Sequence, residues 1–221
     1  MFFYGEAEFL EGSGGITEQF SLDGKTYRVH RFLQNGTLTI EYSGLVEYLI
    51  IGGGGGGGRG FEGSVGGILG KYDGNGGDAG QMISGSIILA AQSYPIIVGG
   101  FSVTSGNPSS AFNITAAGGA FKGSARNQIN GVGASGGING LQSSIDGTLK
   151  YYAGGGGAGG NANGGLGGGG RGGLASFGFP GIANTGAGGG GGERDRWGHR
   201  YYSKNGGAGA SGIVIIRYEI A

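Results

Sequence analysis

The most chemically varied stretch of the sequence lies between residues 193 and 204, near the C-terminus. It reads Glu-Arg-Asp-Arg-Trp-Gly-His-Arg-Tyr-Tyr-Ser-Lys and holds the only tryptophan of the chain. Its two carboxylates, Glu193 and Asp195, are residues of the kind that glycosidases use as acid and nucleophile. Arginines surround them, however, and no second acidic motif accompanies them. A charged loop exposed to solvent is therefore the simpler interpretation of the two carboxylates.

The same stretch has the composition of a recognition loop. Trp, Tyr and Arg dominate binding hot spots because they are large and rigid or pair in bidentate fashion. The hypothesis is that this loop contacts a cell-surface glycan or protein; the alternative is that Trp197 packs against a β-sandwich formed by the rest of the chain or against a neighbouring subunit. The candidate receptor-binding residues are Arg196, Trp197, Arg200, Tyr201 and Tyr202, and polar loops elsewhere add Asn107, Ser109, Arg126 and Asn127.

Few other residues suggest chemistry. The chain has no cysteine, which excludes disulfides, thiolate metal sites and a cysteine nucleophile. Its two histidines, His30 and His199, have no partner spacing typical of a metal site, and His30 is expected to be structural. Gly52–Gly57 satisfies the dinucleotide-binding pattern, but any six glycines do, and no helical pattern follows. We therefore expect a protein that is not an enzyme and that uses no cofactor and no metal.

The overall composition excludes several further classes. Of 221 residues, 63 are glycine and only 3 are proline, without the repeat that collagen requires. Hydrophobic residues make up 37% and charged residues 13%, the opposite of a disordered chain. A formal net charge of zero gives no electrostatic reason to expect binding to nucleic acid. No stretch approaches transmembrane length, and the first residues lack the pattern of a signal peptide.

The elements that must position the charged stretch are runs of glycine. An ordered glycine segment loses about 1–2 kcal/mol of backbone entropy per residue and buries almost no apolar area. Such a segment is therefore disordered, or its backbone groups bond laterally to neighbouring backbones in close array. We predict the second, a bundle of extended polyglycine helices of the polyproline type. The runs are Gly52–Gly58, Gly154–Gly157, Gly167–Gly170 and Gly188–Gly192.

Strand-like segments lie at both ends of the chain and in the middle. Alternating or wholly apolar patterns predict strands, and an Asn-Gly pair at residues 35 and 36 predicts a hairpin turn. Closely spaced strands of this kind favour a sandwich over parallel α/β units. We expect residues 1–24 to form an N-terminal attachment arm or edge strands, and residues 25–221 to form one glycine-rich domain. The predicted strands are 25–32, 37–42, 46–51, 86–91, 94–98, 111–116 and 213–218.

Several segments carry a family resemblance when they are taken in order: Thr26–Thr37, Val46–Gly58, Tyr94–Gly99, Ser110–Gly119, Ala183–Gly192 and Ser211–Tyr218. They resemble the glycine-rich domain of phage tail and tail-fibre proteins over most of residues 25–218. The glycine-rich region is also similar to polyglycine-helix phage adhesin tips and, more distantly, to a receptor kinase ectodomain with a jelly-roll sandwich. The resemblance implies an all-β fold, a jelly-roll-like β-sandwich with an inserted polyglycine-II helix bundle and almost no α-helix.

The resemblance also implies a function. We expect a phage virion structural protein, a tail-fibre or tail-tip component that presents loops for host-surface receptor binding. Its partners would be other virion proteins and a host cell-surface glycan or outer-membrane protein, and the family implies a homotrimer. One alternative is a capsid head-fibre or decoration protein with no receptor role. Another is an ice-binding polyglycine protein, which would need ordered rows of threonine or alanine, whereas the threonines here are scattered.

Overall fold

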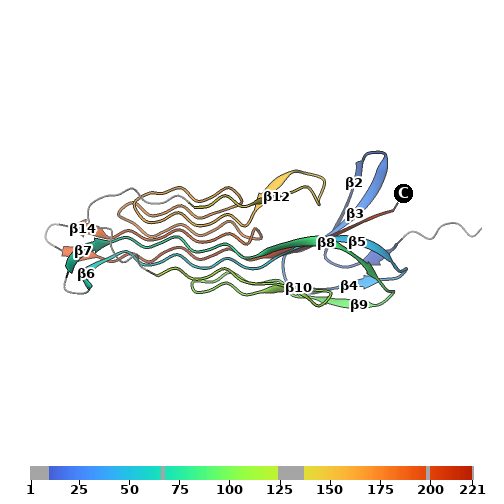
Figure 1. The fold of residues 1–221 in the computed structure, drawn as a ribbon, viewed down its shortest axis with the longest axis horizontal. Coiled ribbons are helices and arrows are strands. Elements are labelled where there is room, and N and C mark those ends of the chain that lie inside the picture. The colour runs from blue at the N-terminus through green and yellow to red at the C-terminus, as the bar shows by residue number, and fades with distance from the viewer. Residues whose placement is uncertain (1–9, 66–67, 124–136, 198–199, 221) are drawn as a thin grey trace, which may run out of the picture.

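The computed structural model describes residues 10–65, 68–123, 137–197 and 200–220 and is elongated (Figure 1). Two β-sheets form one end, and glycine-rich segments run lengthwise from them to short hairpins at the other end. No helix occurs in the described ranges. The C-terminus lies at the sheet end, and so does Leu10, the first described residue. The expected all-β class is confirmed.

The larger sheet has five antiparallel strands in the order β2-β3-β16-β5-β8. Its central strand, β16, pairs with β3 on one side and β5 on the other. Residues 213–216 of β16 are all apolar and all buried, because both faces of the sheet are covered. The strands span Ile16–Leu22 (β2), Lys25–Phe32 (β3), Gly44–Ile51 (β5), Met82–Leu89 (β8) and Ile213–Glu219 (β16).

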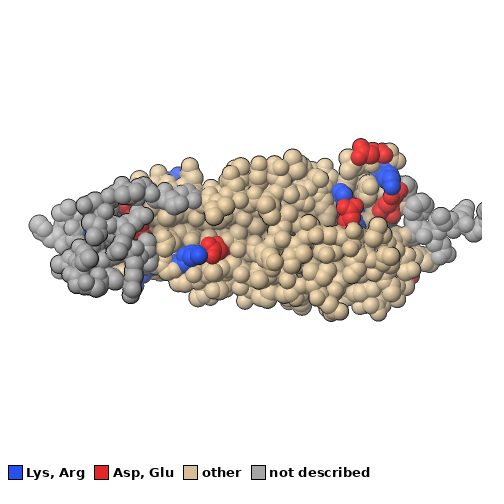
Figure 2. Space-filling view, viewed as in Figure 1, with Lys and Arg blue, Asp and Glu red and all other residues tan. Residues whose placement is uncertain are grey.

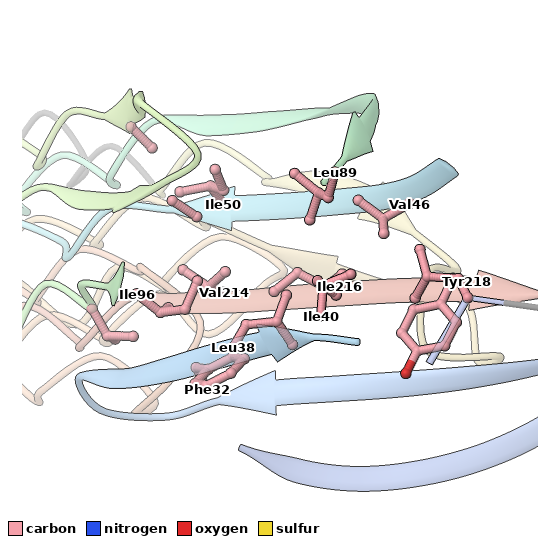
Figure 3. Close-up of a cluster of buried hydrophobic side chains, with 14 residues drawn as sticks. Phe32, Leu38, Ile40, Val46, Ile50, Leu89, Ile96, Val214, Ile216 and Tyr218 are labelled. Carbon is pink, nitrogen blue, oxygen red and sulfur yellow. The ribbon is translucent and has the colours of Figure 1, made fainter. Parts of the chain in front are cut away.

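A three-stranded antiparallel sheet packs on one face of the larger sheet to complete a sandwich. Its order is β1-β4-β9, formed by Gly12–Ser13 (β1), Gly36–Ile40 (β4) and Ser93–Ile96 (β9). Apolar side chains from the two sheets meet between the layers, as Figure 3 shows for Leu38 and Ile40 of β4 facing Val214 and Ile216 of β16. This layer is the main hydrophobic core, and burial of such side chains contributes about 1.5–3 kcal/mol each.

The link from β3 to β4 differs from the sequence-based expectation. A hairpin was predicted at the Asn-Gly pair, but β3 and β4 lie in different sheets, so that prediction is wrong. The side-chain oxygen of Asn35 instead accepts a hydrogen bond from the backbone N–H of Val98 at 2.8 Å. Phe32 and Leu38 both belong to the core, and the chain crosses between the layers because this places their side chains in the same interior.

The opposite face of the larger sheet carries a second apolar cluster. Leu49 and Ile215 pack there against Ile145 and Tyr152, which come from the hairpin of β12 (Leu141–Ser143) and β13 (Lys150–Tyr152). Burial raises the pKa of Tyr152 to about 12. In the loop of this hairpin, the buried carboxylate of Asp146 contacts the amine of Lys150 at 2.6 Å. The larger sheet is therefore covered on both faces where the glycine segments begin.

A short hairpin replaces the continuous strand predicted at residues 111–116. Ser109–Ala111 (β10) pairs with Ile114–Ala116 (β11). Phe112 and Asn113 form the turn with φ of 55° and 63°, the paired positive values of a type I′ turn. The Phe112 ring packs edge-on against Tyr94, with 5.4 Å between ring centroids. This contact with the sandwich offsets the strain of a positive φ at a residue with a bulky side chain.

The glycine-rich segments between the sandwich and the distal hairpins form a feature that we call the shaft. Its central segment, Gly52–Gly58, continues directly from β5 and is wholly buried. All seven of its amides donate hydrogen bonds to backbone carbonyls of other segments, with N···O distances of 2.7–3.0 Å. The predicted lateral bonding between bare backbones is thus present. The shaft comprises residues 52–60, 74–81, 99–107, 117–123, 137–140, 153–160, 163–173, 178–182, 186–192 and 204–212.

The hydrogen bonds of the central segment repeat every three residues. The first, fourth and seventh amides donate to residues 81, 78 and 75, the second and fifth to 107 and 104, and the third and sixth to 210 and 207. The backbone of a β-strand forms hydrogen bonds with only two neighbouring strands, one on each side. Successive amides of this segment instead donate to three neighbouring segments in turn. The hydrogen-bond partners of this segment therefore recur with a period of three residues.

Close approach explains why these positions are glycine. A Cβ added at Gly54 would overlap the carbonyl of Ala187, and one at Gly57 would overlap the carbonyl of Gly190. Both obstacles are backbone atoms, which cannot rotate aside as a side chain does. By contrast, a Cβ at Gly100 meets nothing within 4 Å. The central tract is therefore glycine for steric reasons, as at the axis of collagen.

His30 is a buried histidine that ties β3 to the core. Its Nδ1 lies 2.7 Å from the carbonyl of Gly14, which can only accept, so Nδ1 carries the proton. Its Nε2 then accepts from the hydroxyl of Tyr218 at 3.0 Å. The structural role predicted for His30 is confirmed. Desolvation by burial lowers the pKa of His30 below its ordinary value of 6.5.

Acidification is expected to destabilise the protein through this histidine. Because the unfolded chain takes up a proton near pH 6.5 and folded His30 does so only at lower pH, the unfolded state binds more protons in that window. Stability should therefore fall as the pH drops through and below 6.5. Thermal melting from pH 8 to pH 5 measures this, with His30→Gln as the control. If the variant lost stability with pH as steeply as the wild type, His30 would not be the responsible group.

Candidate recognition tip

Two β-hairpins close the shaft at the end farthest from the sandwich (Figure 1). The strand β15 of one hairpin lies against β6 of the other. We call the described parts of these two hairpins the tip. They are Phe61–Val65 (β6) paired with Ile68–Tyr72 (β7), and Asp195–Trp197 (β14) paired with Arg200–Tyr202 (β15).

Each hairpin begins where a glycine run ends. The central run leads through Gly60 into β6, and the run that ends at Gly192 leads into β14. Gly60 and Lys204 exchange backbone hydrogen bonds, with N···O distances of 2.9 and 3.2 Å, and so join the two hairpins at their base. The tip is therefore held by the same main-chain bonding that builds the shaft.

The charged stretch from residue 193 was interpreted as a solvated loop, and for Glu193 that interpretation is wrong. Glu193 is only 8% exposed, and its carboxylate accepts a hydrogen bond from the backbone N–H of Ala175 at 2.8 Å. Its own N–H donates to the carbonyl of Ser176 at 3.0 Å. The carboxylate thus fixes the neighbouring turn, where Ala175 has a φ of 48°. This structural role accounts for Glu193 without a glycosidase mechanism.

Exposed aromatic residues beside the tip form a feature that the sequence analysis missed. Phe177 is 59% exposed, and the amine of Lys204 lies 5.3 Å from its ring centroid. Phe179 is also exposed, and the guanidinium of Arg171 lies 5.7 Å from its ring centroid. Both contacts have the geometry of cation–π pairs. The alternation of Phe177 and Phe179 was the available signal, because two large aromatic residues in a glycine-rich segment have little core to enter.

The structure brings the main candidate residues together on one hairpin. Arg196 and Trp197 lie on β14, directly opposite Tyr201 and Arg200 of β15. Tyr202 pairs with Asp195 and has an exposed side chain. The hairpin itself was not predicted, although a glycine at position 198 between two polar-aromatic runs is a turn signal. Likewise, the Gly-Gly pair at residues 66 and 67 between apolar runs is typical of the hairpin seen as β6 and β7.

The further candidates do not join this group. Asn107 is exposed, but its carbonyl accepts the N–H of Gly53, which places it at the base of the shaft beside the sandwich. Ser109 is a correction: it is wholly buried, and its hydroxyl donates to the carbonyl of Ile51 at 2.6 Å while accepting the N–H of Gly99. It is thus a bridge between shaft and sandwich. Arg126 and Asn127 lie outside the described residues.

On the visible face, several Lys, Arg, Asp and Glu side chains cluster at the sandwich end, an oppositely charged pair lies on the shaft, and much of the remaining shaft surface is uncharged (Figure 2). At the sandwich end, Arg31 forms a bidentate ion pair with Glu18, with N···O distances of 2.8 and 2.6 Å.

Within the described residues, no three His, Asp or Glu side chains are grouped so that they would hold a metal ion. No helix long and apolar enough to cross a membrane is found in the same residues.

These features define a class of protein in which a β-sandwich carries a shaft of glycine-rich segments with hairpins at its far end. A sequence model described as a glycine-rich domain matches residues 100–219, which is more than half of the chain. The protein therefore belongs to the glycine-rich domain family. No curated protein matches the chain in sequence. The matched residues include much of the shaft, the hairpin of β14 and β15, and all of the central strand β16.

Proposed function

We propose that this protein is a bacteriophage virion component, part of a tail fibre or tail tip, that binds a host-surface receptor through its tip. The observation that carries the proposal is the separation of the two ends of the molecule (Figure 1). Leu10 and the C-terminal strand lie in the sandwich, whereas two hairpins formed from distant parts of the chain meet at the far end. Binding residues commonly sit on loops that a rigid scaffold presents. The sandwich would then join other virion proteins and leave the tip free.

We further infer that the shaft segments are polyglycine II helices. The support is the three-residue repeat of hydrogen bonds in Gly52–Gly58 and its recurrence in Gly188–Gly192, where Gly188 and Gly191 donate to Gly154 and Gly157. Seven residues of such a helix span about 22 Å. Stiffness would come from many lateral bonds, each contributing about 1 kcal/mol net. A stiff shaft lets the tip residues change without disturbing the scaffold.

The chemistry of the tip supports a glycan or protein receptor. The hairpin of β14 and β15 carries the Trp, Tyr and Arg side chains that are enriched at binding hot spots. The exposed rings of Phe177 and Phe179, each with a cation beside it, extend the aromatic surface next to this hairpin. Aromatic and cationic groups together suit the apolar faces and anionic substituents of bacterial surface sugars.

Alanine at both Trp197 and Tyr201 is expected to abolish adsorption of the virion to its host. Loss of two hot-spot side chains at about 2 kcal/mol or more each corresponds to roughly a thousandfold weaker binding. The measurement is the adsorption rate of particles that carry the variant, together with their yield and morphology. A matched control replaces Phe101 and Val103, two exposed side chains of the shaft, and should leave adsorption unchanged.

Three results would contradict the proposal. Normal adsorption by the Trp197 and Tyr201 variant would remove the hairpin from receptor binding. Labelling that placed the protein on the capsid rather than the tail would favour the head-fibre or decoration role. The ice-binding alternative predicts thermal hysteresis in the purified protein, and a tail adhesin shows none.

A further inference from the structure

One sheet edge of the sandwich lacks the protection that the other edges have. The edge strands of the two sheets are β2, β8, β1 and β9. In natural proteins, charged side chains, proline or a short strand length protect edge strands from pairing with another chain. β2 carries Glu18, β9 contains Pro95, and β1 has only two residues. β8 is eight residues long, with no charge and no proline, and the middle of the strand is exposed.

The outer edge of β8 is open among the described residues. Its only strand partner there is β5, which pairs along its whole length from Leu89 to Met82. Ser84, Gly85 and Ser86 are all exposed. An exposed edge of this length presents a row of backbone donors and acceptors to any strand that adds to it.

The sequence of β8 is self-complementary. Residues 83–87 read Ile-Ser-Gly-Ser-Ile, which is the same in both directions. If two copies pair antiparallel about Gly85, each isoleucine faces an isoleucine, each serine faces a serine, and glycine faces glycine. A twofold interface requires this kind of self-matching, because each residue meets its symmetry counterpart. We infer that two copies of this chain associate through β8 and join their larger sheets into one.

The side chains beside the edge fit this pairing. The phenol of Tyr48 on β5 reaches over Gly85, where a Cβ would lie 2.7 Å from its hydroxyl oxygen. Two glycines facing each other leave space for the Tyr48 rings of both copies to approach from either side. An aromatic ring laid across a strand glycine covers backbone that would otherwise be bare.

The same pairing gives an exposed apolar side chain a partner. Ile88 is 74% exposed on the outer face of β8, while Met82 on that face packs against the second apolar cluster. With Gly85 at the twofold axis, Ile88 of one copy faces Met82 of the other. The second cluster would then continue across the interface and remove Ile88 from water.

The pairing fixes the shape of the assembly. β8 runs roughly along the long axis of the molecule (Figure 1), and antiparallel pairing reverses one copy relative to the other. The two shafts must therefore point in opposite directions, with a tip at each end of the particle. This shape distinguishes the dimer from the threefold, side-by-side arrangement that the family resemblance implies.

Sedimentation equilibrium and small-angle X-ray scattering of the full chain test the inference. We expect a dimer whose maximum dimension far exceeds that of the monomer. The variant Ser84→Lys with Ser86→Lys places like charges opposite each other and should be monomeric. The variant Ser84→Lys with Ser86→Glu places each lysine opposite a glutamate of the other copy and should restore the dimer. All these substitutions are at exposed positions, so the monomer fold provides a common reference, checked by circular dichroism.

Four outcomes would overturn the inference. They are a wild-type chain that is monomeric or trimeric, a dimer that survives the double lysine substitution, a lysine–glutamate variant that stays monomeric, and a dimer with the compact dimensions of two shafts side by side. The lysine–glutamate variant tests the register itself, because only pairing about Gly85 brings residue 84 opposite residue 86.

Discussion

Replacing Gly54 with alanine is expected to lower the free energy of unfolding by about 3 kcal/mol or more, because the added methyl overlaps backbone. The obstacle is the carbonyl of Ala187, which belongs to the buried shaft segment 186–192. Either that segment moves away, breaking its own lateral bonds, or the central segment leaves the shaft. Urea or thermal unfolding of the purified protein measures the loss.

The control for this substitution is Gly100→Ala, for which the opposite sign is expected. A Cβ at Gly100 meets nothing within 4 Å, and the residue does not have the positive φ that disfavours side chains. Alanine there restricts only the unfolded chain and should stabilise the protein by about 0.4–1 kcal/mol. A Gly54 variant as stable as the Gly100 variant would contradict the close packing of the shaft.

Replacing Ile216 with alanine is expected to destabilise the sandwich by about 2–5 kcal/mol. Ile216 is fully buried in the central strand β16, between the two sheets (Figure 3). The shaft should lose protection together with the sandwich. Its segments bury little apolar area, so they have no core of their own to hold them when the sheets separate.

Amide hydrogen exchange followed by mass spectrometry tests that coupling. A loss of about 3 kcal/mol corresponds to roughly hundredfold faster exchange through global unfolding, in sheet and shaft alike. The matched control is Ile182→Ala, at a position that is 65% exposed, which should change stability by no more than about 0.5 kcal/mol. Shaft amides that kept their protection in the Ile216 variant would mean that the shaft is stable alone.

Much of the sandwich could be predicted from the sequence because its strands show local patterns. The predicted segments at 25–32, 46–51 and 213–218 correspond to β3, β5 and β16. The prediction of which strands pair with each other failed. The Asn-Gly pair at residues 35 and 36 has the local chemistry of a hairpin turn, yet burial of Phe32 and Leu38 in one core places the flanking strands in different sheets. Pairing is decided by contacts between distant residues, which a local pattern does not contain.

At the tip, too, local features could be predicted from the sequence, whereas contacts between distant residues could not. Residue types pointed to the stretch around Trp197, and the structure adds that it is a hairpin lying against a second one from residues 61–72. That neighbour comes from more than a hundred residues away, so no spacing in the sequence indicates it. Ser109 was misassigned because a serine in a polar loop has the same local pattern whether it faces solvent or bridges Ile51 and Gly99. Lateral bonding in the shaft was predictable, since buried backbone groups must find partners.

The threefold repeat of hydrogen bonds in Gly52–Gly58 limits how genes for such proteins can change in length. In the polyglycine II geometry proposed above, deleting a single codon in the middle of a run would rotate everything beyond it by about 120° and direct each amide to the wrong neighbour. Inserting three residues keeps each amide directed at the same neighbouring segment, provided that the adjoining runs lengthen as well. Lineages should therefore grow or shrink this rod in steps of three residues per run, while point changes in the hairpins accumulate freely.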